Sequence, residues 1–235
     1  MIRVGIGGWV FAPWRGEFYP KGLPQAHELE HASRKLTSIE INGTFYRTQK
    51  PESFRKWAAE TPDDFVFSVK GPQFATNRRV LAEAGESIER FFGSGVLELK
   101  SKLGPILWQM APTKKFDPED FEGFLALLPK ELDGRAIRHV VEVRQASFLV
   151  PAFIELLRKF SVAVVLVESG KHPLIADVTS DFVYARLQGT SEKENTGYPA
   201  KALDLWAKRD VFIYMISGAK VRAPAAAMAL IERLS

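Results

Sequence analysis

The feature that most limits the fold of this chain is a regular alternation of short apolar runs with segments whose apolar residues repeat at helical spacing. Eight runs have the length of a β-strand, and most are followed by such a helical segment. The predicted strands span residues 3–8, 38–42, 65–70, 105–109, 139–144, 162–167, 182–188 and 211–216. The run at 162–167 is almost wholly apolar, which is typical of a strand buried on both faces. The alternation therefore predicts a parallel sheet with helices packed against it.

The number of β–α repeats indicates one parallel architecture in particular. Eight repeats in 235 residues fit a (β/α)₈ barrel of the TIM type, which typically takes about 250 residues. An open doubly wound sheet is the alternative, because the strand pattern does not reveal whether the sheet closes. One unit, near residues 168–182, has no evident helix and is expected to be irregular. The sequence shows no linker, internal repeat or change in composition, so we expect a single domain over residues 1–235.

Composition excludes several classes of site and partner. Since the chain has no cysteine, it has no disulfide, thiolate zinc site or cysteine nucleophile. No stretch approaches the roughly 18 uninterrupted apolar residues of a membrane span. The first residues lack the basic and apolar regions of a signal peptide. We therefore expect a cytoplasmic protein without a membrane partner, and the sequence does not indicate its oligomeric state.

The net charge favours an anionic partner. At +4, with a pI near 9.2, the chain attracts anions. Its basic residues are scattered rather than gathered in one run. A small anionic molecule is therefore the favoured partner, and nucleic acid is the less favoured one.

Polar side chains gather at the predicted C-terminal ends of the strands, which is where parallel α/β folds place their sites. These residues are Glu40, Asn42, Lys70, Gln109, Glu142, Arg144, Glu168, Arg186 and Gln188. Because side chains alternate along a strand, pairs such as Glu142 and Arg144 share one face, and in a barrel that face can be the interior. Charges of both signs are then expected to meet at one mouth of the barrel.

The residue types in this cluster suit acid–base catalysis on an anion. Glu40 and Glu142 are candidates for general acid and base, provided that their surroundings separate their pKa values. Lys70 can stabilise charge, or act as a Schiff-base nucleophile when it is desolvated. Arg144 and Arg186 offer paired donors to a phosphate or carboxylate. We therefore predict an enzyme with isomerase, lyase or hydrolase chemistry on a small phosphorylated or carboxylated substrate, with Glu40, Lys70 and Glu142 as its catalytic residues.

The remaining candidates are expected to contact the substrate without reacting. Aromatic side chains near the first two strands can wall a pocket or stack on a ring. The predicted substrate-binding residues are Trp9, Trp14, Asn42, Tyr46, Gln109, Arg144, Glu168, Arg186 and Gln188.

Other interpretations of the cluster remain open. The charges can satisfy one another as a structural ion network that closes the barrel, although buried ion pairs are a costly way to stabilise a core. A non-catalytic ligand-binding barrel fits the same residues, as does a nucleic-acid-binding protein or metal-dependent phosphodiesterase of the endonuclease-barrel type. No cofactor is predicted; Mg²⁺ held by Glu40, Glu142 and Glu168 is a weaker alternative.

Several motifs together resemble a known family. They include Gly7–Trp9, Phe67–Lys70 and Val141–Arg144, and the most specific is the block Glu40–Arg47, which reads EINGTFYR. On these motifs the chain resembles the DUF72 (YecE-like) proteins over nearly its whole length. The resemblance implies a TIM-type barrel, and it implies no particular reaction.

The chain departs from the family pattern at several strand ends. The family usually has histidine where Gln145 and Gln188 stand, and tryptophan near the position of Phe148. A typical run of Phe, an acidic or amide residue and Asn is replaced by Met215, Ile216 and Ser217. The loss of two histidines and an amide makes histidine-based proton transfer or metal binding less expected in this chain.

Overall fold

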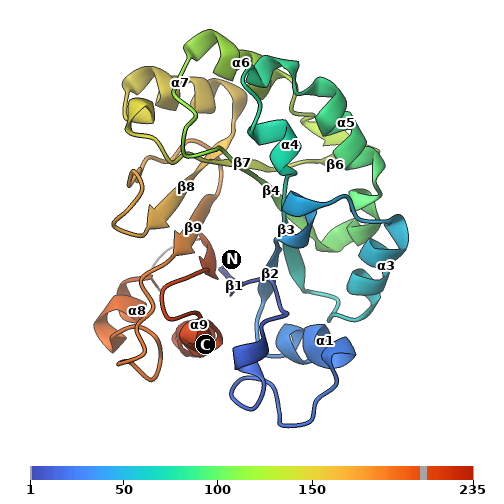
Figure 1. The fold of residues 1–235 in the computed structure, drawn as a ribbon, viewed down its shortest axis with the longest axis vertical. Helices are drawn as coiled ribbons and strands as arrows, with labels where there is room; N and C mark the ends of the chain where they lie inside the picture. Colours follow the sequence, from blue (N-terminus) through green and yellow to red (C-terminus); the bar gives the residue numbers. More distant parts are fainter. Residues whose placement is uncertain (1, 207–210, 235) are drawn as a thin grey trace.

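The predicted strands form a closed parallel barrel. The computed structural model describes residues 2–206 and 211–234, and within them the strands are hydrogen-bonded in the closed order β1-β10-β9-β8-β7-β4-β3-β2 (Figure 1). The barrel strands are β1 (Arg3–Gly7), β2 (Ser38–Ile41), β3 (Val66–Lys70), β4 (Leu103–Gln109), β7 (His139–Glu142), β8 (Ala163–Glu168), β9 (Val183–Leu187) and β10 (Val211–Met215). The barrel is therefore confirmed, and the open sheet is wrong.

Helices surround the barrel, as the ring of coiled ribbons in Figure 1 shows. They are α1 (Glu28–Ser33), α2 (Gly43–Tyr46), α3 (Pro51–Ala59), α4 (Gln73–Thr76), α5 (Gly85–Gly93), α6 (Pro118–Ala126), α7 (Pro151–Phe160), α8 (Ala200–Trp206) and α9 (Ala223–Ile231). Short 3₁₀ segments lie at Ala12–Trp14, Gln25–His27, Leu81–Glu83, Val96–Lys102, Ala146–Phe148 and Lys220–Arg222. The last helix, α9, packs against β1 and so covers the junction between the first and last strands. None of the helices in the described ranges is long and apolar enough to cross a membrane.

Several predicted boundaries differ from the structure. The stretch 78–103, one of the segments with helical spacing, is divided into a 3₁₀ turn, α5 and a second 3₁₀ segment, and β4 begins at Leu103, two residues before the predicted strand 105–109. The break after α5 comes from Gly95, whose φ of 98° a helix does not allow. A small antiparallel pair, β5 (Glu131–Leu132) and β6 (Arg135–Ala136), was not predicted. No helix lies between β8 and β9, as predicted for the irregular unit near residues 168–182. Another segment with helical spacing, residues 200–208, contains α8, and its positions 207 and 208 lie outside the described residues.

The barrel interior is filled by side chains below the level of the site. The rings of Tyr184 and Tyr214 pack in a tilted arrangement with 5.0 Å between their centroids, among aliphatic residues of the neighbouring strands. The hydroxyl of Tyr214 lies 2.6 Å from the hydroxyls of both Ser38 and Ser68. At Gly5 a Cβ would lie only 1.9 Å from the carbonyl oxygen of Ser38, so the strands approach too closely there for any side chain. This packed layer supports the polar residues above it.

Lys102 anchors the C-terminal end of α3, and its loss gives a testable effect. Its Nζ is buried and donates to the carbonyl oxygens of Ala58 and Thr61, both at 2.6 Å. The substitution Lys102→Met removes the ammonium donor from both carbonyls and leaves that of Ala58 with only a 3.3 Å contact from the Thr61 hydroxyl, so we expect the free energy of unfolding to fall by about 1–3 kcal/mol. Urea unfolding measures this, with Lys50→Met at an exposed position as the control. An equal effect of the two substitutions would contradict the anchoring role.

Candidate functional site

Arg186 lies at the centre of a buried ion network at the C-terminal ends of the strands. Its Nε and Nη2 donate to the two carboxylate oxygens of Glu40, at 3.1 and 3.0 Å. Its Nη1 donates to Glu142 and, at 3.3 Å, to Oε1 of Gln109. The side chains of Glu40 and Glu142 are fully buried, and that of Arg186 is 3% exposed. One guanidinium on β9 therefore joins carboxylates that arrive from β2 and β7.

Arg144 closes this network on the solvent side. It follows β7, and its Nε donates to Oε1 of Glu142 at 2.7 Å. Its Nη2 donates to Oε1 of Gln109, also at 2.7 Å. The Arg144 side chain is 21% exposed. Nη1 of Arg144 makes no hydrogen bond to any residue that the structure describes, so it remains available to a ligand.

Tyr184 supports the network from below. Its hydroxyl donates to Oε2 of Glu40 at 2.7 Å, from two positions before Arg186 on the same face of β9. Burial, reinforced by the Glu40 charge, raises the pKa of the Tyr184 hydroxyl well above its ordinary value. The hydroxyl thus remains a hydrogen-bond donor at every pH at which the protein would be studied.

The electrostatic environment keeps Glu142 ionised. Burial alone would raise the pKa of its carboxyl group, but the charges of Arg186 and Arg144 outweigh burial and hold the pKa below its usual range. A carboxylate with a lowered pKa stays ionised, so it accepts hydrogen bonds, but it is a weak base and has no proton to donate. The structure therefore favours Glu142 as a fixed acceptor over Glu142 as a general acid.

Lys70, at the end of β3, is the member of the cluster without a polar partner. Its side chain is buried, and its Nζ lies 4.0 Å from the centroid of the Phe45 ring. Within residues 2–206 and 211–234 its Nζ has no hydrogen bond and no ion pair. Burial lowers the pKa of Lys70 to about 8; Arg186 and Arg144 act in the same direction, and the two glutamates oppose them. At pH 7 the Lys70 amine is therefore mostly protonated, and roughly a tenth of it is neutral.

The charges of this cluster do not balance. Glu40 and Glu142 carry two negative charges, and Lys70, Arg144 and Arg186 carry three positive ones when all are ionised, which leaves +1. The arginines and glutamates form the bonded network, so the surplus positive charge belongs to Lys70.

Asn42 lies against the network, whereas Trp9 packs against other aromatic residues. Asn42 is half-buried and its Nδ2 contacts the backbone oxygen of Glu40 at 3.4 Å. A Cβ on Gly7 would lie 3.0 Å from Asn42 Nδ2, so glycine at this position leaves room for the amide. Trp9 is partly buried and packs edge-on against Trp57 at 5.2 Å between ring centroids.

The other predicted residues lie elsewhere. Trp14 is fully buried in the N-terminal loop, where its Nε1 donates to the carbonyl oxygen of Lys220. Tyr46 is 70% exposed. Glu168 accepts a hydrogen bond from Tyr198 at 2.6 Å instead of joining the network, and the half-buried Gln188 follows β9 beside it. Pattern analysis did not select Phe45 or Tyr184, although the position of Tyr184 two residues before Arg186 places it on the same face.

No metal site is formed by the carboxylates proposed for Mg²⁺. Among the residues with described positions, no group of three or more His, Cys, Asp or Glu side chains is placed to hold a metal ion. Glu40 and Glu142 are held by guanidinium groups, and Glu168 by Tyr198.

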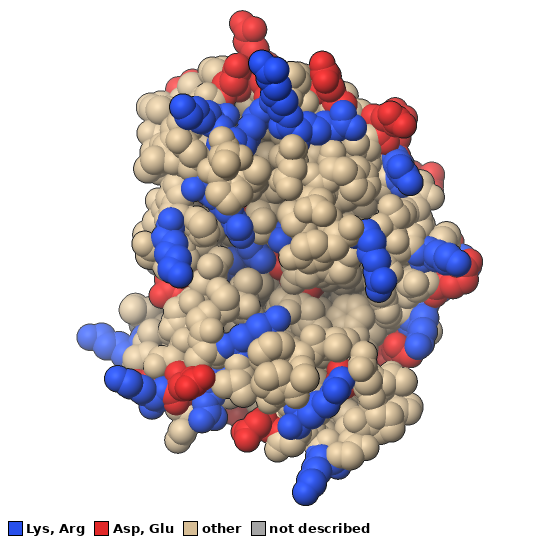
Figure 2. All heavy atoms as spheres, viewed as in Figure 1, with Lys and Arg blue, Asp and Glu red and all other residues tan. Residues whose placement is uncertain are grey.

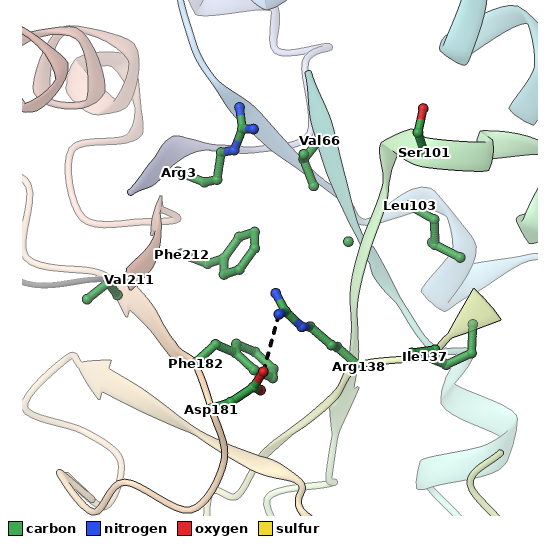
Figure 3. Close-up of a pocket in the computed structure, with 12 residues that line it drawn as sticks. Arg3, Val66, Ser101, Leu103, Ile137, Arg138, Asp181, Phe182, Val211 and Phe212 are labelled. Carbon is green, nitrogen blue, oxygen red and sulfur yellow. Dashed lines mark hydrogen bonds and ion pairs between the residues drawn. The ribbon is translucent and has the colours of Figure 1, made fainter. Parts of the chain in front are cut away.

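A separate hollow of about 510 Å³ opens at the other, N-terminal end of the barrel. Figure 3 shows Arg138 and Phe212 projecting into it, with Arg138 paired to Asp181 at 3.2 Å. It contains none of the predicted site residues, and active sites of (β/α)₈ barrels lie at the opposite end. We therefore place the candidate site at the C-terminal end.

The surface charge does not form one continuous patch on the face drawn in Figure 2. Lys and Arg side chains are spread over this face, including its central part, whereas Asp and Glu side chains lie mostly near its periphery. This distribution agrees with a site for a small molecule better than with a broad contact to nucleic acid.

The fold and the cluster define a (β/α)₈-barrel protein with a buried cluster of charged side chains at the C-terminal ends of its strands. Residues 3–235 match the family model described as "Protein of unknown function DUF72". The chain belongs to the DUF72 family, and the resemblance noted in its motifs is confirmed.

Relatives of this chain agree with that assignment. UPF0759 protein YecE of Escherichia coli is 28% identical over 143 residues, which are 59% of this chain and 49% of YecE. UPF0759 protein YunF of Bacillus subtilis is 26% identical over 168 residues, which are 69% of this chain and 57% of YunF. The matches thus span about half the length of these curated relatives. A solved DUF72 family structure from Thermotoga maritima is 26% identical with a TM-score of 0.77, covering 98% of this chain and 97% of that one.

Proposed function

We propose that the site binds a small anionic molecule and transforms it by acid–base chemistry. The observation that supports this most directly is Lys70, a buried side chain whose ammonium lies over the Phe45 ring but has no hydrogen bond or ion pair to any described residue, in a cluster whose net charge is +1. A bound monoanion would bring that charge to zero. Burial of a charge without a partner is costly, so a ligand that supplies the partner gains binding free energy.

Each residue of the cluster then has a definite role. Lys70 faces the anion and, because its pKa is about 8, accepts or returns a proton near neutral pH. Arg144 directs its free Nη1 to a phosphate or carboxylate oxygen. Arg186 and the two glutamates form the rigid frame that holds these donors, with Gln109 bonded to both arginines. Proton transfer by Lys70 is the basis of isomerase or lyase chemistry, and a hydrolase would use it to activate water.

A purely structural ion network explains less of the geometry. It accounts for Glu40, Glu142 and Arg186, which satisfy one another. It gives no reason for Lys70, because an extra buried cation lowers stability when it has no partner.

Binding of simple anions tests the proposal. Oxalate and malonate are titrated calorimetrically into the wild type and into Lys70→Met and Lys70→Arg. We expect at least a tenfold loss of affinity in Lys70→Met and partial retention in Lys70→Arg. The wild-type affinity should fall as the pH rises through about 8, because the anion favours the protonated amine.

The catalytic part is checked separately. Malonate, whose methylene group has carbon-bound protons, is incubated in D₂O with each protein, and exchange of those protons is followed by NMR; we expect Lys70→Met and Lys70→Arg both to abolish it. Lys50→Met, at an exposed position, serves as the control. Equal anion affinities in Lys70→Met and the wild type would refute the binding role of Lys70.

A further inference from the structure

A basic groove lies on the same side of the barrel as the candidate site. It is formed by the segment after α4 and the segment after β4, and it has a volume of about 490 Å³. Its walls include Asn77, Arg78, Arg79, Ala111, Lys114 and Lys115. No Asp or Glu lines it in the part of the chain that the structure describes. Four cationic side chains therefore surround one concave space.

The walls of the groove are held in place. Nζ of Lys114 donates to the carbonyl oxygen of Arg79 at 2.7 Å and to Oδ2 of Asp120 at 2.6 Å. Oδ1 of Asp120 in turn accepts the backbone N–H of Ala82 at 2.9 Å. Lys114 and Asp120 are only 12% and 13% exposed, which is unusual for an ion pair at a surface. The two segments are thus tied to each other and to α6.

Arg78 is fixed as well. Its Nε donates to the carbonyl oxygen of Phe74 at 3.1 Å, and its Nη2 donates to the hydroxyl of Ser87 at 2.8 Å. These bonds orient the guanidinium without neutralising it. Arg79 and Lys115 are exposed, and neither forms an ion pair with another described residue.

The net positive charge of the groove favours binding of a multiply charged anion. Arg78, Arg79, Lys114 and Lys115 carry four positive charges, and Asp120 behind the wall compensates one, which leaves +3. Like charges this close repel one another, and a phosphate or diphosphate relieves that repulsion while accepting several charge-assisted hydrogen bonds. We infer that this groove binds the phosphate or diphosphate group of the substrate.

The groove lies next to the proposed reaction site. Ala111 is two residues after Gln109, which accepts hydrogen bonds from both Arg144 and Arg186. Two extended residues span at most about 7 Å, so one small molecule can reach from the groove to the mouth of the barrel. This inference rests on the proposed function and names its substrate class: a phosphorylated small molecule whose phosphate end occupies the groove and whose reacting end meets Lys70.

Pyrophosphate is the probe that tests the groove. We compare its calorimetric affinity at low salt in the wild type, in Arg79→Gln/Lys115→Gln, and in a control with Lys21→Gln/Lys35→Gln. The control removes the same number of charges at exposed positions outside the groove. We expect pyrophosphate affinity to fall at least tenfold in Arg79→Gln/Lys115→Gln and to change little in the control. Neither substitution removes a side-chain hydrogen bond to a described residue, so the fold should be retained.

Three results would overturn the inference. The first is an equal loss of pyrophosphate affinity in both double variants, and the second is no binding of pyrophosphate to the wild type. The third is displacement of pyrophosphate by a duplex oligonucleotide whose own binding requires Arg79 and Lys115. The last result would assign the groove to nucleic acid. Failure of the proposed function is recognised by a different measurement, namely unchanged oxalate affinity in Lys70→Met.

Discussion

Replacing Arg186 by methionine is expected to lower the free energy of unfolding by about 3–5 kcal/mol, which is the usual cost of breaking a buried ion pair from one side. The substitution leaves the carboxylates of Glu40 and Glu142 in the barrel interior, where both are fully buried. Tyr184 still donates to Glu40, and Arg144 still donates to Glu142, but neither replaces the bidentate contact of Arg186. Chemical denaturation at pH 7 measures the loss.

A second background tests the same ion network even if Arg186→Met alone folds poorly. In the background Glu40→Gln/Glu142→Gln the buried negative charges are absent, so Arg186→Met should cost much less there. The same reasoning predicts that the deficit of the single variant narrows at acid pH, as the stranded carboxylates take up protons. Arg144→Met, which removes a partly exposed partner, should cost less than Arg186→Met. A loss below about 1 kcal/mol at pH 7 would show that the network contributes no more than a surface ion pair.

The sequence was sufficient to predict the fold, because the barrel depends on a pattern that repeats along the whole chain. The alternation of apolar strands with helical segments is visible without any tertiary information. Boundaries were less certain where a single backbone angle decides them, as at Gly95, whose positive φ ends the helical run. The small β5–β6 pair was missed because two-residue strands have no detectable periodicity.

The sequence predicts which residues form the candidate site better than it predicts what each residue does there. Strand period identifies which face carries Glu40, Glu142 and Arg186, and the structure does bring them together. It does not reveal side-chain rotamers, so the sharing of one guanidinium between both glutamates could not be foreseen. Nor could the isolation of Lys70, which depends on where the arginines direct their donors. For Trp14 and Tyr46 the sequence shows only that an aromatic residue is present, and one is buried in a loop while the other is exposed.

Arg186 and Lys70 therefore differ in what they contribute to the folded protein. Arg186 is surrounded by acceptors and is needed for the burial of two carboxylates. Lys70 is buried among the same charges but gains no bond from them. A residue that costs stability and lies at the mouth of a barrel is better explained by a ligand than by folding.

Lys70→Met should accordingly raise the free energy of unfolding at pH 7 while it removes anion binding. The pKa of Lys70 falls from the ordinary value of 10.5 to about 8 on folding. One unit of difference between the two pKa values corresponds to about 1.4 kcal/mol. Below pH 8 the charged Lys70 therefore lowers the free energy of unfolding by about 3 kcal/mol. Between about pH 8 and 10.5 the folded state has lost the proton and the unfolded state keeps it, so the stability of the wild type rises with pH.

The difference between Lys70→Met and the wild type is thus largest below pH 8 and shrinks as the pH approaches 10.5. Denaturation curves of both proteins at several pH values measure it, and the titration of tyrosines above pH 10 cancels in the comparison. Lys102→Met is the matched control, because that buried lysine has acceptors and its loss should destabilise the protein at every pH in this range. If Lys70→Met is instead less stable than the wild type at pH 7, Lys70 has a stabilising partner in the free protein. The charge of Lys70 then does not require an anionic ligand at the mouth of the barrel.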